Sequence, residues 1–249
     1  IKKIMKTLII IPSRLSATRL PGKPLLEING KSIISHVFKK AEEANIGDVF
    51  VATEDIEIME DVKKNGGQAI LTSRNHKTGT DRVYEAMSKI SKSDVELIIN
   101  LQGDEPLMNI EDIRNLHNHM VETKFGLGTL AAKILDKSLY QNKNVVKVIT
   151  KKSLENSQFT EAVKFTRKLS ISAQNAYHHL GIYCYKCDIL KKFVSLNQSK
   201  NEIRNNLEQL RALDNGINIH VAFANSSPIG VDTKEDFLAI KKIMEYKSQ

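Results

Sequence analysis

The chain has 249 residues, and a hydrophobic fraction of 41% with a charged fraction of 27% indicates a folded protein rather than a disordered one. Lysine and arginine outnumber aspartate and glutamate by 37 to 29, and this net charge of +8 favours anionic partners. The basic residues are scattered and tryptophan is absent, which leaves nucleic-acid binding as a weaker alternative. The longest apolar run near the start, residues 8–12, is too short to span a membrane, so we expect a cytoplasmic protein without membrane insertion.

Short apolar segments alternate with helical patterns in the first half of the chain. Strands are predicted at residues 7–12, 49–53, 68–71 and 95–101. Helical spacing of apolar residues lies between them, over residues 33–44, 56–62 and 83–90. This alternation is typical of βαβ units, whose ligands bind beyond the carboxyl ends of parallel strands. We therefore predict an α/β fold with a mostly parallel sheet flanked by helices.

The pattern changes to closely spaced strands after residue 122. Strands are predicted at residues 127–134, 145–150, 163–166 and 179–185, followed by a helix at 207–213, a strand at 217–223 and a closing helix at 236–244. Because no linker or repeat separates the two patterns, we predict one domain over residues 5–249, to which residues 127–187 contribute a smaller β-rich lobe.

A basic loop follows the first predicted strand. Arg14, Arg19 and Lys23 surround Gly22 there, and small hydroxyl residues lie among them. Glycine lets a backbone approach phosphate closely, arginine offers a fixed fork of donors, and lysine acts as a compact charge. The loop therefore suits a triphosphate, although its charge alone is equally typical of a basic surface turn.

Carboxylates follow the buried strand that ends at residue 101. Asp104 and Glu105 stand before Pro106 at this strand end, and oxygen ligands of this kind suit Mg²⁺. Asp232 is a second candidate ligand, directly before the last predicted helix. The alternative is that Asp104 is a turn residue and that Asp232 or Thr233 is a helix N-cap.

Two further motifs are weaker. Cys184 and Cys187 form a C-x-x-C close to His178 and His179, but two cysteines fall short of a structural zinc site, and a strand would send them to opposite faces, so we expect free thiols. Residues 126–131 fit G-x-G-x-x-A, yet they lead into a strand rather than into a helix, which excludes a dinucleotide-binding turn.

Six blocks of the sequence, in this order, closely resemble the 3-deoxy-manno-octulosonate cytidylyltransferases, or CMP-KDO synthetases. They are Arg14 with residues 18–25 (TRLPGKPL), 79–82 (GTDR), 100–106 (NLQGDEP), 179–183 (HLGIY), 207–211 (LEQLR) and 230–233 (GVDT). The resemblance implies a nucleotide-diphospho-sugar-transferase-like fold, a homodimer, CTP and KDO as substrates, Mg²⁺, and a role in lipopolysaccharide synthesis.

The resemblance also implies a role for each matching residue. The catalytic residues are Arg14, Lys23, Asp104 and Asp232, of which the two aspartates carry the metal. The CTP-binding residues are Arg14, Thr18, Arg19, Lys23, Gly79, Thr80, Arg82 and Gln102. The sugar-binding residues are Arg167, His179, Tyr183, Glu208 and Gln209.

The chain departs from the family at a few positions. Ala17 stands where the family commonly has serine, and residues 168–171 lack the usual Ile-Pro after Arg167. These departures leave two alternatives open. One is a cytidylyltransferase for another acidic sugar of the sialic-acid type, and the other is a non-catalytic relative that binds nucleotide.

Overall fold

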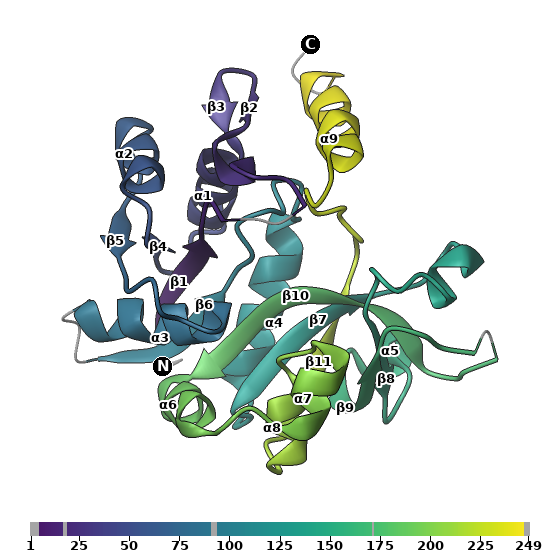
Figure 1. Cartoon of the computed structure of the whole chain (residues 1–249). Helices are drawn as coiled ribbons and strands as arrows, with labels where there is room; N and C mark the ends of the chain where they lie inside the picture. Colours follow the sequence, from purple (N-terminus) through teal and green to yellow (C-terminus); the bar gives the residue numbers. More distant parts are fainter. Residues whose placement is uncertain (1–4, 17–18, 91–93, 171, 247–249) are drawn as a thin grey trace. The chain divides into compact units, whose positions relative to one another are not determined.

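A computed structural model describes residues 5–16, 19–90, 94–170 and 172–246, and its chain divides into two compact units. The first unit contains Ile1–Ile113 and Pro228–Gln249, and the second contains Arg114–Ser227. Figure 1 labels the elements of both units. Across the described ranges, none of the helices is both long and apolar enough to cross a membrane.

The first unit is built on four parallel strands in the order β5-β4-β1-β6. They are β1 (Lys6–Ser13), β4 (Asp48–Thr53), β5 (Ala69–Leu71) and β6 (Val95–Asn100). The helical elements are η1 (Lys23–Leu25), α1 (Ile33–Glu43), α2 (Ile56–Lys64), α3 (Gly79–Lys89) and α9 (Lys234–Tyr246), and a small hairpin pairs β2 (Glu27–Ile28) with β3 (Lys31–Ser32). The long α4 (Ile110–Glu122) contains the boundary between the units.

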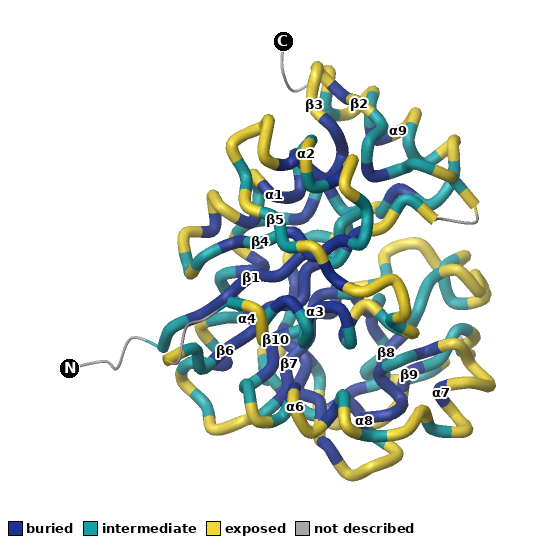
Figure 2. The backbone as a smooth tube through the Cα atoms, turned by 60° about the vertical axis from the view of Figure 1, so that its left-hand side comes forward, coloured by how far each residue is buried: buried dark blue, intermediate teal, exposed yellow. Residues whose placement is uncertain are grey.

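The strands of the first unit are apolar because both faces of the sheet are covered. Leu8, Ile9, Ile10 and Ile11 in β1 are completely buried, as are Leu97, Ile98 and Ile99 in β6. Figure 2 shows these buried stretches as dark segments of the tube. The alternation of strand and helix predicted from the sequence is therefore confirmed in this unit.

The carboxyl ends of β1 and β6 lie side by side, because Ile10 pairs with Asn100 in the parallel register. The loops that follow these two strands therefore leave the sheet at the same edge. Gly103 lies close to β1: a Cβ built on it would lie 3.1 Å from the carbonyl oxygen of Pro12. A larger residue would require the two backbones to move apart by a few tenths of an ångström.

The second unit is a ring of five mostly antiparallel strands. Its strands are β7 (Leu127–Ala132), β8 (Lys147–Thr150), β9 (Phe159–Thr166), β10 (Ala176–Lys186) and β11 (His220–Ala224). Their order is β10-β7-β11-β9-β8, and β8 also pairs with β10, which closes the ring. Its short helical elements are η2 (Lys137–Tyr140), α5 (Leu154–Ser157), α6 (Cys187–Ser195), α7 (Lys200–Asn205) and α8 (Leu210–Asp214).

The predicted β-rich segment, residues 127–187, contains four strands of this unit, and the unit continues beyond the segment on both sides. The sequence pattern missed α6 and α7 and placed the start of the helix at 207–213 too early, since α8 begins at Leu210. The chain forms two compact units, and the single domain over residues 5–249 stays a prediction.

Candidate active site

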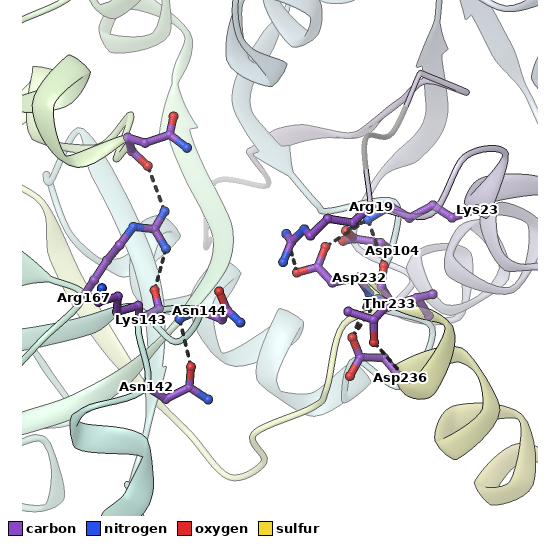
Figure 3. Close-up of polar contacts among 12 residues, drawn as sticks. Arg19, Lys23, Asp104, Asn142, Lys143, Asn144, Arg167, Asp232, Thr233 and Asp236 are labelled. Atoms are coloured by element: carbon purple, nitrogen blue, oxygen red, sulfur yellow. Dashed lines mark hydrogen bonds and ion pairs between the residues drawn. The ribbon is translucent and has the colours of Figure 1, made fainter.

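Three segments of the first unit converge on the ammonium group of Lys23 (Figure 3). Lys23 Nζ lies 2.5 Å from Asp104 Oδ2, 2.8 Å from the carbonyl oxygen of Val231 and 3.3 Å from Asp232 Oδ1. The backbone N–H of Val231 donates to the carbonyl of Asp104 at 2.8 Å, so the two carboxylate-bearing loops are joined directly. Lys23, Asp104 and Asp232, three of the residues that the resemblance assigns to metal and triphosphate, therefore form one cluster.

Asp232 is held between two cations. Its Oδ2 lies 2.9 Å from Arg19 Nη2, while its Oδ1 faces Lys23. Burial opposes the charge of Lys23, but the carboxylates of Asp104 and Asp232 outweigh it and raise the pKa of the ammonium above its ordinary value. Lys23, Arg19 and the two aspartates thus make an ion cluster with no net charge.

The N-cap of α9 is Thr233 and not Asp232. Thr233 Oγ1 accepts a hydrogen bond from the backbone N–H of Asp236 at 3.1 Å, and Asp236 Oδ2 accepts one from the backbone N–H of Thr233 at 2.9 Å. This reciprocal pair satisfies the helix terminus. The capping alternative is therefore correct for Thr233 and wrong for Asp232, whose carboxylate faces the cations.

Glu105 does not join the cluster, although it adjoins Asp104 in the sequence. Its Oε2 is buried without a hydrogen-bond partner among the described residues. Burial, together with the negative charges of Asp104 and Asp232, raises the pKa of Glu105 to about 8. Without a metal cation nearby, the carboxyl group is thus mostly protonated at neutral pH. The carboxylate pair comprises Asp104 and Asp232.

The loop after β1 is closed at its base by its own backbone. Gly22 has a φ of 70°, a conformation that suits glycine, and its N–H donates to the carbonyl of Leu15 at 3.2 Å. Arg14 and Arg19 are exposed on this loop. Thr18, which the resemblance assigns to CTP, and Ala17 lie outside the described residues.

The GTDR block begins α3, with Gly79 exposed and Thr80 buried. Thr80 Oγ1 accepts a hydrogen bond from Asn100 at the end of β6, at 3.3 Å. The guanidinium of Arg82 is buried and donates to Glu54, to Thr72 Oγ1 and to the carbonyl of Ser73. The role of Arg82 in CTP binding stays a prediction. In the structure, the Arg82 side chain is buried and binds other residues of the protein.

Gln102 lies half-buried in the loop after β6, two residues before Asp104. Beside it in the sheet edge, Ser13 Oγ at the end of β1 and Asn100 Oδ1 at the end of β6 are buried without hydrogen-bond partners among the described residues. Buried polar atoms normally have partners, so unsatisfied ones collected at one strand edge are a feature of functional sites. Ser13 and Asn100 are therefore candidates for contact with a bound ligand at this edge.

The five predicted sugar-side residues all lie in the second unit. Arg167 follows β9, and its guanidinium donates to the carbonyls of Lys143, Asn205 and Asn206 at 3.0, 3.2 and 3.0 Å (Figure 3). These three bonds use three of the five N–H groups of the side chain, one on each nitrogen. One N–H on each terminal nitrogen is not used by these three bonds.

His179, Tyr183 and Glu208 lie close together. The ring centroids of His179 and Tyr183 are 5.5 Å apart, and His179 Nε2 lies 3.0 Å from Thr129 Oγ1. Burial, with a smaller effect of His178, lowers the pKa of His179 to about 3. Burial also raises the pKa of Tyr183 well above its ordinary value, and Tyr185 and Glu208 add to this rise. Both rings are therefore neutral near pH 7.

Gln209 and Arg211 in the LEQLR block are buried. Arg211 forms a two-pronged ion pair with Glu202, at 2.9 Å from Nε and 2.6 Å from Nη2, and its guanidinium carbon lies 4.6 Å from the centroid of the Phe193 ring. The arginine of this block therefore stabilises the packing of α6, α7 and α8. Sequence reasoning missed its partner Glu202, because no local pattern links the two.

The two cysteines of the C-x-x-C are free thiols. Cys184 is buried in β10, and burial raises the pKa of its thiol. Cys187 begins α6 rather than continuing the strand, so the expectation that one strand carries both cysteines was wrong.

Comparison with known proteins defines the class. Residues 8–219 match the model of the cytidylyltransferase family. A 3-deoxy-manno-octulosonate cytidylyltransferase of Afipia carboxidovorans is 41% identical over 96% of both chains. A solved structure of CMP:2-keto-3-deoxy-manno-octonic acid synthetase in complex with CTP has a TM-score of 0.87 and 35% identity, covering 97% of this chain and 99% of that one.

The chain thus belongs to the nucleotidyltransferases, and within them to the 3-deoxy-manno-octulosonate cytidylyltransferase family. The fold predicted from the sequence is confirmed. The same fold is found in the solved structure of the 4-diphosphocytidyl-2C-methyl-D-erythritol synthase of Anaerococcus prevotii, with a TM-score of 0.66 at 14% identity and coverage of 98% of both chains.

Proposed function

We propose that the protein transfers the cytidylyl group of CTP to the anomeric hydroxyl of 3-deoxy-manno-octulosonate (KDO), giving CMP-KDO and pyrophosphate. The observation that carries this proposal is the convergence of Lys23, Asp104 and Asp232 at the carboxyl edge of the parallel sheet. The near full-length similarity to 3-deoxy-manno-octulosonate cytidylyltransferases supports the choice of nucleotide and sugar.

The residues around this cluster can bind a triphosphate. Arg14 and Arg19 are exposed on the loop after β1, and Lys23 begins η1 beside them. Arginine binds phosphate oxygens through paired donors, and lysine acts as a point charge, so this loop would hold the β- and γ-phosphates and stabilise the departing pyrophosphate.

Asp104 and Asp232 fit a magnesium ion, because their oxygens already converge on a single cationic group, the ammonium of Lys23. Among the described residues no group of three or more His, Cys, Asp or Glu side chains could hold a metal. Phosphate oxygens and water would therefore complete the coordination, as Mg²⁺ prefers in nucleotide sites. A bound ion supplies charge neutralisation at the phosphates and increases the acidity of the attacking hydroxyl.

Lys23 has a second consequence for metal binding. Its ammonium occupies the position between the two carboxylates, and the cluster formed with Arg19 carries no net charge. A divalent cation alone would leave this cluster with an excess of positive charge, whereas the triphosphate brings compensating negative charge. We therefore expect metal and nucleotide to bind together, with Lys23 moving from the carboxylates to the phosphates.

The acidic sugar would be bound by the second unit. Arg167 keeps two N–H groups available for the carboxylate of the sugar. The neutral rings of His179 and Tyr183, with Glu208 near Tyr183, can contact the hydroxyls of the sugar. No side chain needs to form a covalent intermediate, since positioning the anomeric hydroxyl in line with the leaving pyrophosphate provides most of the rate. Homodimer formation, the cytoplasmic location and the supply of lipopolysaccharide synthesis are further parts of the proposal.

The test is pyrophosphate release by the purified protein with CTP, Mg²⁺ and KDO. We expect turnover that requires all three, much lower turnover with the other nucleoside triphosphates, and a loss of several orders of magnitude in Asp104→Asn while the protein remains folded. A sialic acid in place of KDO separates the two sugar classes. Turnover with sialic acid but not with KDO contradicts the proposed substrate, and binding of CTP without turnover of any acidic sugar contradicts the proposed reaction.

A further inference from the structure

Lys147 is a buried lysine in the second unit to which sequence reasoning gave no role. It begins β8 and is completely buried. In the sheet it is paired with Thr166 of β9 on one side and with His178 of β10 on the other. Its two partners directly precede Arg167 and His179, so Lys147 lies between the strand that Arg167 follows and the strand that contains His179.

The ammonium of Lys147 holds three backbone carbonyls. Its Nζ lies 2.7 Å from the oxygen of Asn142, 2.8 Å from that of Val145 and 2.6 Å from that of Arg167. Three donors with three acceptors satisfy the hydrogen-bonding capacity of the group. Lys147 therefore fixes the backbone of Arg167 to the loop before β8.

Arg167 contacts the same loop from its other end. Its Nη1 donates to the carbonyl of Lys143, which lies between the two loop carbonyls that Lys147 binds. The remaining bonds of the guanidinium, to Asn205 and Asn206, secure it against the segment before Glu208. The direction of the guanidinium thus depends on a loop whose shape the buried ammonium maintains.

Every acceptor in this network is a neutral backbone carbonyl. The two positive charges of Lys147 and Arg167 therefore are not balanced within it, and the charge of Arg167, after burial, helps to lower the pKa of Lys147. Burying a charged lysine is costly unless a charge of opposite sign lies nearby. A carboxylate bound at Arg167 would offset one of these two charges and would be attracted by both.

We propose that Lys147 is a positioning residue for the acidic sugar, which orients Arg167 through the backbone and adds its charge to the attraction of the sugar carboxylate. This inference rests on the proposed function. It assigns to the site a preference for sugars that carry a carboxylate over uncharged ones, and it places part of that preference in a residue that does not touch the substrate.

The experiment compares KDO with its uncharged methyl ester as substrates of the wild-type protein, Lys147→Gln and Lys147→Arg. We expect Lys147→Gln to raise the KM for KDO and to reduce the preference for acid over ester, each by about tenfold, the size expected of one charge acting over several ångströms at intermediate dielectric. The KM for CTP should be unchanged. Lys147→Arg restores the charge and several donors, and should recover most of the preference.

Leu190→Ala is the matched control, because Leu190 is a completely buried residue of α6 in the same unit. It should lower the melting temperature and leave the preference for acid over ester unchanged. If folded Lys147→Gln behaves like this control, the inference is overturned. If Lys147→Gln does not fold, Lys147→Met is measured in its place. Independently of that result, loss of the preference for acid over ester in folded Lys147→Arg also overturns the inference. Absence of wild-type turnover with any acidic sugar refutes the proposed function itself, and this inference with it.

Discussion

Asp232 and Thr233 are adjacent, and the structure gives them opposite tasks. The side chain of Asp232 contacts Lys23 and Arg19, whereas Thr233 caps α9. Replacing Asp232 by Asn removes a negative charge from the ion cluster with Lys23 and Arg19 and leaves the cap intact. We expect turnover to fall by about 100- to 1,000-fold, the size found when one group that stabilises transition-state charge is removed.

The effect of Asp232→Asn on stability should be small. The Asp232 side chain is 43% exposed and that of Arg19 is 56% exposed, and ion pairs at this level of exposure contribute between 0 and about 1 kcal/mol. Thr233→Ala should do the reverse: loss of the cap costs about 1 kcal/mol, which lowers the melting temperature by roughly 2–4 °C in a chain of this size, with turnover preserved.

Melting curves and pyrophosphate release on both variants provide the test. The reasoning is refuted if Asp232→Asn keeps near-normal turnover and melts earlier than Thr233→Ala, because Asp232 would then be the capping residue. A large loss of turnover in folded Thr233→Ala would equally contradict the division of roles.

Three further outcomes are expected. Without nucleotide, Lys23→Met should bind Mn²⁺ about tenfold more tightly than the wild-type protein, since no ammonium competes for the carboxylates, and it should bind CTP more weakly. Electron paramagnetic resonance of free Mn²⁺ measures the Mn²⁺ affinity. An unchanged affinity would contradict competition between Lys23 and the metal. Glu202→Gln should lower the free energy of unfolding by about 3–5 kcal/mol, because it removes the negative charge that faces the buried guanidinium of Arg211. Normal stability in a urea titration would reject this. The pKa of His179 is lowered to about 3 in the folded protein, so the unfolded chain takes up a proton first as the pH falls. The contribution of His179 to the free energy of unfolding is therefore fully present above about pH 6.5. It falls toward pH 3 by up to ~1.4 kcal/mol per pH unit. His179→Asn should reduce the slope of unfolding free energy against pH between 6 and 4, and urea titrations that give the wild-type slope would count against this assignment.

The first unit was predictable because its structure is visible in local sequence. Strand β1 is a run of apolar residues, as a parallel strand covered on both faces must be, and α1 has a regular apolar face. Helix α7 offered no such signal: it is short and polar, and its one large apolar residue, Ile203, is 65% exposed. Tertiary contacts, above all the ion pair of Glu202 with Arg211, form part of its environment instead.

The candidate site was predictable only in part. The residues themselves predicted a basic loop and a carboxylate after a buried strand, but the pairing of Asp104 with Asp232 depended on the resemblance, because local sequence equally allowed Asp232 to be a cap. The neutral state of Glu105 and the burial of Lys147 were beyond sequence reasoning. Both depend on the low polarity of surroundings that are assembled from distant parts of the chain.

The first unit is discontinuous, since it comprises residues up to Ile113 and those from Pro228 onward. Synthesis on the ribosome proceeds from the N-terminus, so the parallel sheet with Asp104 can emerge and fold while the second unit is still being made. Asp232 arrives only with the final segment. A chain that stalls before Pro228 would therefore contain the basic loop and Asp104 but not Asp232. The order of synthesis thus places completion of the candidate carboxylate pair after synthesis of the whole second unit.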